Sequence, residues 1–312
     1  MNRDHALNRS AALASVAVAL LLVALKTWAA WTTGSTAMLG SLADTGLDLV
    51  ASLATLLGVW IAAQPDDENH RFGHGKAEAL AAMFQVVLIS ISALTLAARA
   101  GGQWLAGVRP AAAEEGIAVS VLSIAATLLL LAWQRHVIRR TGSLAIATDH
   151  VHYKSDLLLN LAVIGALALD HFGGIAGADA LFGLGIAGWL GWNAWGASQT
   201  AVNQLMDHEW PDERKARFLD VVARHPELRG LHDLRTRTSG NRDFVQFHMA
   251  VDPAMTVGAA HDVMDDVEAK LLAEFPGVEI LIHLDPEGLI NETGLAAQDL
   301  LAEFEAGHAR AG

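Results

Sequence analysis

The sequence lacks cysteine altogether, and its charged residues are scarce, at 18% of 312 positions. A soluble domain carries roughly 25% charged residues. Without cysteine there is no disulfide and no thiolate ligand, so any metal site must use histidine and carboxylates. Also missing are a Walker P-loop, an Asp-Lys-Thr-Gly phosphorylation segment and a His-Glu-x-x-His motif. These absences disfavour an ATP-driven pump and an intramembrane metalloprotease.

The shortage of charge is uneven along the chain. Residues up to about 205 form a series of apolar blocks. Residues from 207 to the end carry 10 lysines and arginines against 21 aspartates and glutamates, which accounts for −11 of the net charge of −13. An acidic domain argues against nucleic acid as a partner, because phosphates need basic residues. It is compatible with cations, although most surface carboxylates are simply solvated.

The apolar blocks predict an α-helical membrane domain. A membrane-spanning helix needs about 20 mostly apolar residues. Six stretches approach or exceed this length, so we expect six transmembrane helices at 11–31, 37–63, 79–100, 116–133, 143–169 and 179–205. The first stretch is too long for a cleavable signal peptide and lacks a small-residue cleavage site.

Basic residues predict the orientation of these helices. They gather before the first stretch, between the second and third, between the fourth and fifth, and after the sixth: Arg3, Arg9, Arg71, Lys76, Arg135, Arg139, Arg140, Arg214, Lys215 and Arg217. The connections on the opposite side hold few basic residues. The positive-inside rule then places both termini in the cytoplasm.

The C-terminal part has the pattern of a small α+β domain. After a turn at Glu209-Trp-Pro-Asp, we expect a helix to about residue 225 that opens with acidic side chains. Two alternating strands, 231–238 and 244–251, flank the hairpin pattern Ser239-Gly-Asn-Arg. A helix at 257–275 and a strand at 278–284 follow. The order αββαβ predicts a small sheet with its helices on one face.

Four potential metal ligands lie inside the apolar stretches. Asp44 and Asp48 are four residues apart in the second stretch, and His152 and Asp156 are four apart in the fifth, so each pair shares one helix face. A carboxylate deep in a bilayer costs roughly 2.5–3.5 kcal/mol. One imidazole and three carboxylates would form a tetrahedral shell that suits Zn²⁺. The alternatives are polar contacts between helices and a proton relay without metal. Asp149 extends the stripe as a second-shell or access-path residue, or is simply solvated.

Two further clusters contain histidine. In the loop after the second stretch, Asp67, His70 and His74 are spaced three and four apart. They would converge on an ion if the segment turned helically, and otherwise form a solvated polar loop. The acidic domain contains a second group of potential ligands. Some of them lie on predicted strand faces, which favours a metal site, but all could be scattered surface residues. The group is His232, His248, His261, His283 and Asp285.

Together these motifs resemble the cation diffusion facilitator family, in particular its bacterial ferrous-iron/zinc efflux branch. The matching segments begin at Ser41, Asp67, His152, His232 and Ile282. They read Ser-Leu-Ala-Asp-Thr-Gly-Leu-Asp, Asp-Glu-Asn-His-Arg-Phe-Gly-His-Gly-Lys-Ala-Glu, His-Tyr-Lys-Ser-Asp, His-Asp-Leu-Arg-Thr-Arg and Ile-His-Leu-Asp-Pro. The likeness covers nearly the whole chain to about Pro286.

The resemblance implies a homodimeric, proton-coupled antiporter in a bacterial inner membrane. It assigns residues 1–206 to the transmembrane domain and 207–290 to a metallochaperone-like, metal-binding dimerisation domain, and leaves 291–312 as a tail without recognisable features. The transport site would be Asp44, Asp48, His152 and Asp156, with metal also at the loop and domain clusters. Leu284 departs from close relatives, which can carry a polar residue that adds a ligand at this position. The resemblance therefore leaves open the number of ions or the affinity of the domain site, but not the transport site.

Three functions compete on the sequence. A secondary transporter that exchanges a divalent metal ion for protons is the leading hypothesis, because metal ligands must lose protons to bind. The others are the metalloprotease, which lacks its motif, and a membrane metal sensor that binds without transport. His152 favours Zn²⁺ and tolerates Cd²⁺, Fe²⁺ or Co²⁺, whereas an all-oxygen set would favour Mn²⁺.

Overall fold

The computed structural model describes residues 3–33, 36–106, 117–173, 178–224, 229–240 and 242–288. The chain divides into two compact units, Met1–Leu205 and Met206–Gly312. The expected tail at 291–312 lies outside the described residues.

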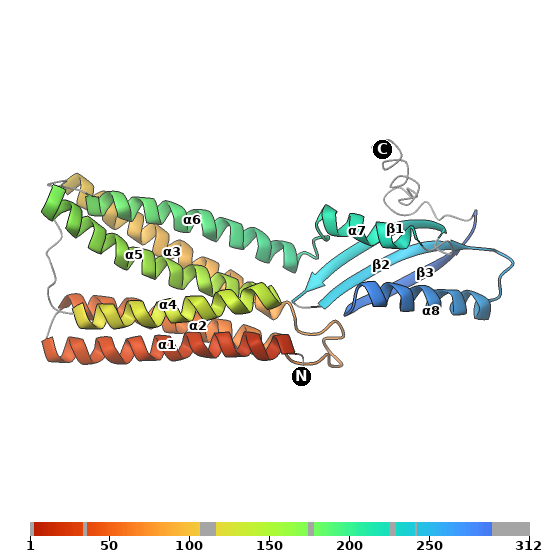
Figure 1. Cartoon of the computed structure of the whole chain (residues 1–312), viewed down its shortest axis with the longest axis horizontal. Helices are drawn as coiled ribbons and strands as arrows, with labels where there is room; N and C mark the ends of the chain where they lie inside the picture. Colours follow the sequence, from red (N-terminus) through yellow and green to blue (C-terminus); the bar gives the residue numbers. More distant parts are fainter. Residues whose placement is uncertain are drawn as a thin grey trace. The chain divides into compact units, whose positions relative to one another are not determined.

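The first unit is a bundle of long helices (Figure 1). Their bounds are α1 Arg3–Thr33, α2 Thr36–Ala62, α3 Ala77–Ala106, α4 Ile117–Thr141, α5 Leu144–Gly173 and α6 Ala178–Leu205. Each overlaps one of the expected stretches. α1 and α4 extend well beyond the apolar residues that predicted them, α1 at its start and α4 at its end.

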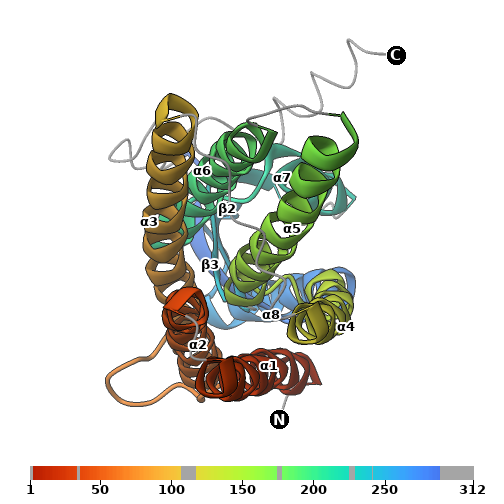
Figure 2. The same cartoon turned by 90° about the vertical axis from the view of Figure 1, so that its left-hand side faces the viewer.

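Small residues let the helices approach closely. α3 runs beside α6, and α1 beside α2 (Figure 2). A Cβ atom added at Gly58 of α2 would lie 2.4 Å from the Cβ of Ala81 in α3, and one added at Gly183 of α6 would lie 3.0 Å from the Cβ of Ala100. Lipid tails are as apolar as the helix side chains, so the hydrophobic effect does not drive helices together in a membrane. Close van der Waals packing of small residues drives their association instead.

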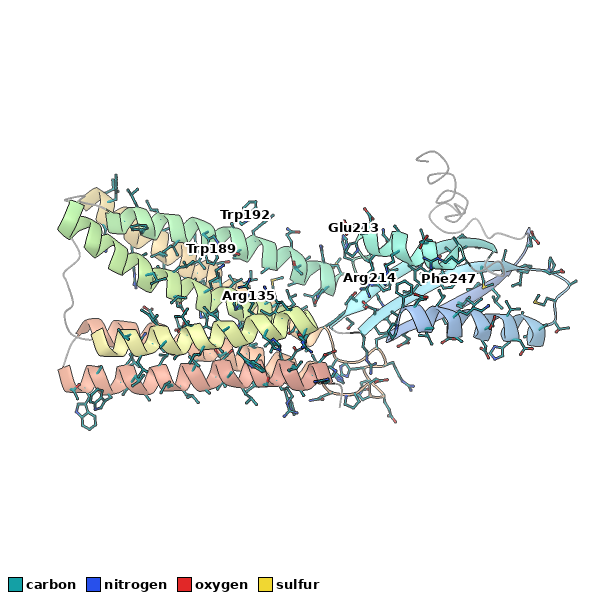
Figure 3. The ribbon with its side chains drawn as sticks, in the orientation of Figure 1. Arg135, Trp189, Trp192, Glu213, Arg214 and Phe247 are labelled. Carbon is teal, nitrogen blue, oxygen red and sulfur yellow. The ribbon has the colours of Figure 1, made fainter. Side chains whose placement is uncertain are left out.

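The described residues include four helical stretches long and apolar enough to cross a membrane: Arg3–Thr32, Asp44–Ala62, Ala77–Leu105 and Val121–Thr141. α5 and α6 do not meet this criterion within the described residues. Large apolar side chains lie on the outside of the bundle, as lipid contact requires: Trp31 is 88% exposed, and Trp192, labelled in Figure 3, is 77% exposed. The first unit is therefore a helical membrane domain.

The second unit contains α7 Asp212–Val222, β1 Arg229–Ser239, β2 Arg242–Val251, α8 Val257–Glu274 and β3 Val278–Pro286. This is the expected αββαβ order. The sheet order is β1-β2-β3, with β1 antiparallel and β3 parallel to β2. Local chemistry sets the turns: Gly240 takes φ +63° in the hairpin, and the Thr256 hydroxyl caps α8 by accepting from the Ala259 N–H.

Both helices cover the same face of this sheet. Phe218 of α7 and Leu271 of α8 share one buried core with Val245, Phe247 and Met249, which alternate along β2. Phe247 is labelled in Figure 3. Because side chains alternate across a strand, the intervening His248 leaves from the opposite face. The fold thus frees one sheet face for a site.

Candidate metal centres

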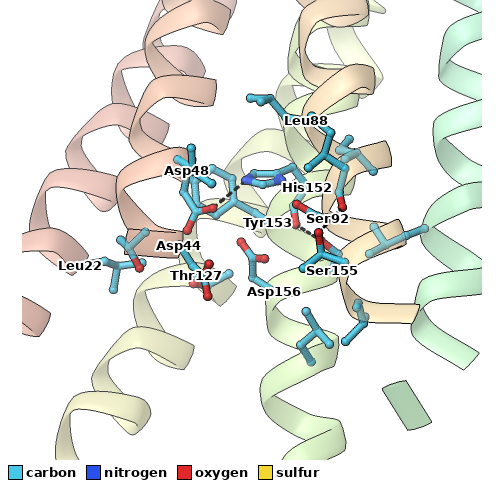
Figure 4. A pocket seen from close by; sticks show the side chains of 18 of the residues that line it. Leu22, Asp44, Asp48, Leu88, Ser92, Thr127, His152, Tyr153, Ser155 and Asp156 are labelled. Atoms are coloured by element: carbon cyan, nitrogen blue, oxygen red, sulfur yellow. Dashed lines mark hydrogen bonds and ion pairs between the residues drawn. The ribbon is translucent and has the colours of Figure 1, made fainter. Parts of the chain in front are cut away.

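The membrane bundle brings Asp48, His152 and Asp156 together. One ligand atom from each lies within 4.8 Å of the other two. The Nε2 atom of His152 is 3.0 Å from Oδ1 of Asp48 across the gap between α5 and α2 (Figure 4). The His152 side chain is 9% exposed and the Asp48 side chain 17%. Nitrogen and oxygen donors at this spacing suit a tetrahedral transition-metal ion.

The fourth expected ligand, Asp44, lies at the same cavity but outside the tight group. The cavity has a volume of about 360 Å³ and is lined by Asp44, Asp48, His152 and Asp156. Apolar and hydroxyl side chains from α1, α3 and α4 also contribute to the lining, among them Leu22, Ser92 and Thr127 (Figure 4). Both i,i+4 pairs therefore line one cavity, one pair from α2 and the other from α5.

Asp149, one turn from His152, is fully buried and is not solvated. Its carboxylate accepts hydrogen bonds from Ser15 at 2.6 Å, Gln85 at 2.8 Å and Gln134 at 2.8 Å, donors on α1, α3 and α4. Neighbouring Tyr153 interacts with the Ser52 hydroxyl of α2 at 2.8 Å. The solvation alternative for Asp149 is wrong, because neutral donors from three helices replace water. This network holds the His152-bearing part of α5 within the bundle.

The loop cluster forms without a helix. The Asp67 carboxylate accepts the backbone N–H groups of Asn69 and His70, at 2.8 and 2.7 Å, in a tight turn. His70 Nδ1 is 3.1 Å and His74 Nε2 is 3.4 Å from this carboxylate. Gly73, at φ +76°, reverses the chain between the two imidazoles. The His70 N–H lowers the pKa of the Asp67 carboxyl below its usual range, which keeps it charged for a cation.

In the second unit, three histidines form a row across the free sheet face. His232 pairs with His248, and His248 with His283, as direct neighbours in the strand register. Asp285 completes the site: its Oδ2 atom lies 2.8 Å from His248 Nδ1 and 3.2 Å from His232 Nε2. His232, His248 and Asp285 meet the ligand-spacing criterion together. The expected strand-face pattern thus produces a compact group.

The other two expected ligands are less closely placed. His283 is 64% exposed and lies 3.4 Å from Asp285 Oδ1, at the rim of the group. His261, on α8, is 62% exposed and faces Asp265 at 3.7 Å. The described part of one chain does not bring His261 into the group. No periodic pattern links a residue of that helix to the sheet face that carries the other histidines.

Some residues that the sequence patterns do not indicate contact these ligands and orient them. His232 Nδ1 lies 2.8 Å from the Gly230 carbonyl, which can fix the tautomer that leaves Nε2 free. His248 Nε2 lies 3.7 Å from Asp233, whose carboxylate is held by Arg235. Asp233 has φ +49°, at an irregularity in the β1–β2 register. The sequence itself shows only that Asp233 directly follows His232.

Comparison with known proteins identifies the family. Residues 12–206 match the description "Cation efflux transmembrane domain", and residues 210–287 match "Cation efflux protein, cytoplasmic domain". The chain belongs to the cation diffusion facilitator family. Cation diffusion facilitators are secondary transporters, so this one is a metal-cation efflux transporter and not an enzyme.

Similar curated proteins extend over almost the whole of this cation diffusion facilitator. It is 44% identical over 282 residues to the cation-efflux pump FieF of Pectobacterium carotovorum, covering 90% of this chain and 94% of that one. The FieF of Cronobacter sakazakii is 43% identical over 288 residues, covering 92% and 95%. That of Yersinia pestis is 42% identical over 285 residues, covering 89% and 92%.

Proposed function

We propose that this cation diffusion facilitator exports Zn²⁺ from the cytoplasm in exchange for protons. The convergence of Asp48, His152 and Asp156 inside the bundle carries the proposal, with Asp44 closing the shell from the same cavity. A mixed nitrogen and oxygen set favours Zn²⁺ and accepts Cd²⁺, Fe²⁺ and Co²⁺.

Ligand chemistry supports proton exchange. A neutral imidazole offers a lone pair to the metal, whereas a protonated imidazole does not, and carboxylates likewise bind metal only when ionised. Metal and protons therefore compete for the same atoms. An acidic exterior favours release of the ion and loading of protons, and the less acidic cytoplasm favours the reverse.

The proposed setting follows the basic residues and the family. Six spans with both termini in the cytoplasm of a bacterial cell place the loop cluster and the C-terminal domain on the side where metal is collected. We propose a homodimer, since the C-terminal match is to the cytoplasmic domain of cation efflux proteins. Regulation or delivery of the metal would be served by zinc at two further sites. One is the loop cluster Asp67, His70 and His74. The other is the His232–His248–Asp285 group, with His283 and His261 as further candidate ligands.

Flux into proteoliposomes with an imposed pH gradient tests the transport site. Asp48→Ala and Asp156→Ala should each lower Zn²⁺ flux by at least about 10–100-fold, the range that even second-shell changes produce. The exposed surface carboxylate Asp212 provides a control, and Asp212→Ala should transport normally. Near-normal flux in either membrane variant would remove the assignment. Zinc binding without flux in the wild type would favour a sensor.

A further inference from the structure

A lysine lies inside the membrane bundle beside the proposed transport site. Lys26 is on α1, within the apolar span Arg3–Thr32. Its ammonium donates to the Thr45 hydroxyl of α2 at 2.6 Å, and Thr45 is only 1% exposed. A lysine in a spanning helix costs roughly 2.5–3.5 kcal/mol unless its long side chain reaches the surface. This one instead bonds to a buried group, so its cost requires a reason.

The cavity supplies that reason. Lys26 lines it together with Asp44, Asp48, His152 and Asp156. Its hydrogen-bond partner Thr45 directly follows Asp44, and the positive charge of Lys26 acts on the Asp156 carboxylate. The ammonium therefore belongs to the electrostatic environment of the ligands.

We propose that Lys26 sets the charge of the transport site and thereby its affinity for the ion. Three ionised carboxylates and one ammonium leave a charge of −2, which a single dication beside a neutral His152 balances. Arg99 of α3 also lines the cavity, but Lys26 is the cation whose ammonium bonds to the buried Thr45, next to Asp44. This inference rests on the proposed transport function.

The balance has a kinetic purpose. Without Lys26 the loaded site would keep a net negative charge and hold the dication more tightly. A transport site must bind its ion strongly enough to load and weakly enough to release it, as in channels. Lys26 thus lowers affinity in favour of turnover.

A plain structural role is the competing explanation, because the hydrogen bond to Thr45 could simply join α1 to α2. Two substitutions separate the two roles. Lys26→Gln retains a donor and removes the charge, whereas Lys26→Arg retains both. Lys154 serves as a matched control: it is a lysine of α5 whose ammonium lies 5.2 Å from the Trp189 ring centre, and it does not line the cavity.

The experiment is equilibrium dialysis of Zn²⁺ with full-length protein in detergent, together with flux in proteoliposomes. Asp156→Ala protein is measured in parallel, so that zinc bound elsewhere can be subtracted. Lys26→Gln should bind transport-site zinc about tenfold more tightly or better, the low end of a neighbouring charge's effect, and should have a lower maximal flux. Lys26→Arg and Lys154→Gln should both match the wild type.

The outcomes separate this inference from the proposed function. If Asp156→Ala removes no bound zinc, the transport site itself is misassigned. If Asp156→Ala removes zinc but Lys26→Gln binds it within twofold of the wild type, or more weakly, Lys26 does not set the charge. If Lys26→Gln is unstable in detergent, Lys26→Met is measured against the same criterion, and wild-type affinity with reduced stability would show a structural role.

Discussion

At the scale of single residues, the imidazole of His152 decides which ions the site prefers. It is the only nitrogen ligand of the proposed shell and contacts Asp48 at 3.0 Å. We predict that His152→Asp relaxes selectivity from Zn²⁺ toward Mn²⁺, since an all-oxygen set favours harder ions. Because carboxylates titrate at lower pH than imidazole, the pH dependence of flux should also shift toward acid. Metal-selective flux across a series of pH gradients measures both.

The control for this prediction is His150→Asp, on the same helix but outside the described cavity lining. It should alter neither selectivity nor the pH profile. If His152→Asp retains the ion preference and the pH profile of the wild type, His152 is neither the selectivity residue nor a coupling residue.

Asp149 provides a second residue-scale prediction, this one on stability. Its carboxylate accepts from three helices, so Asp149→Ala would leave Gln134 with one buried unpaired N–H group and would remove one of the acceptors of Gln85, which keeps the Thr55 hydroxyl and the Ala51 carbonyl. Each unpaired group costs about 1–3 kcal/mol. The thermal unfolding midpoint in detergent should therefore fall by several degrees. Asp149→Asn retains one acceptor oxygen and should lose less. Equal midpoints for Asp149→Ala and the wild type would contradict the network's structural role.

At the scale of elements, the sequence predicted the existence of the helices better than their ends. The expected fourth stretch ends at Trp133, but α4 continues to Thr141 through Gln134 and Arg135. An apolar stretch predicts only the part of a helix that lies in lipid. Glutamine and arginine have high helix propensity, so the helix continues through them beyond the apolar stretch.

The spacing rule worked where one regular element carried the ligands. The pairs at 44 and 48 and at 152 and 156 converge because i and i+4 share a helix face. His232, His248 and His283 are neighbours because the register of the three strands aligns them. The hairpin pattern in the sequence predicts the pairing of the first two strands but not that of the third. His261 could not be placed, because the packing of α8 depends on tertiary contacts that periodicity does not encode.

The loop element yields a prediction about charge and shape. Asp67 both caps the turn and contacts His70 and His74. Asp67→Asn retains the oxygen that accepts the backbone N–H groups but removes the negative charge. We expect the affinity of this loop for zinc to fall by about tenfold, because an anionic oxygen donor is lost. Zinc titration of full-length protein, with His74→Ala as the variant lacking the loop site, measures it.

The pH behaviour of this loop follows from the same contacts. Since the His70 N–H lowers the pKa of Asp67, the carboxylate stays ionised in mild acid. Asp67 therefore contributes its negative charge to zinc binding throughout mild acid and neutral pH. Asp67→Asn should then weaken zinc binding at the loop by the same factor across this pH range. A ratio of wild-type to variant affinity that falls toward one in mild acid would make Asp67 a titrating group instead.

At the scale of the whole molecule, the distribution of charge separates the two units. Most of the net charge of −13 lies after residue 206, on a unit with its own buried core from Trp210 to Ile282. Two copies of such a domain would repel each other. Bound dications at the histidine row would offset part of that repulsion, so assembly and zinc binding should be coupled.

We therefore predict that residues 207–286, produced alone, form a dimer that zinc stabilises. A ligand that binds only the folded state adds about 2.7 kcal/mol at 100 times its dissociation constant, so saturating Zn²⁺ should raise the unfolding midpoint by several degrees. His248→Ala should abolish most of this gain, because His248 lies between His232 and Asp285. His261→Ala should retain it if the separation of His261 from the group persists in the dimer.

Sedimentation of a monomer at saturating Zn²⁺ would refute the coupling. A loss in His261→Ala equal to that in His248→Ala would mean that α8 supplies a ligand after all, through a rearrangement or from the second copy.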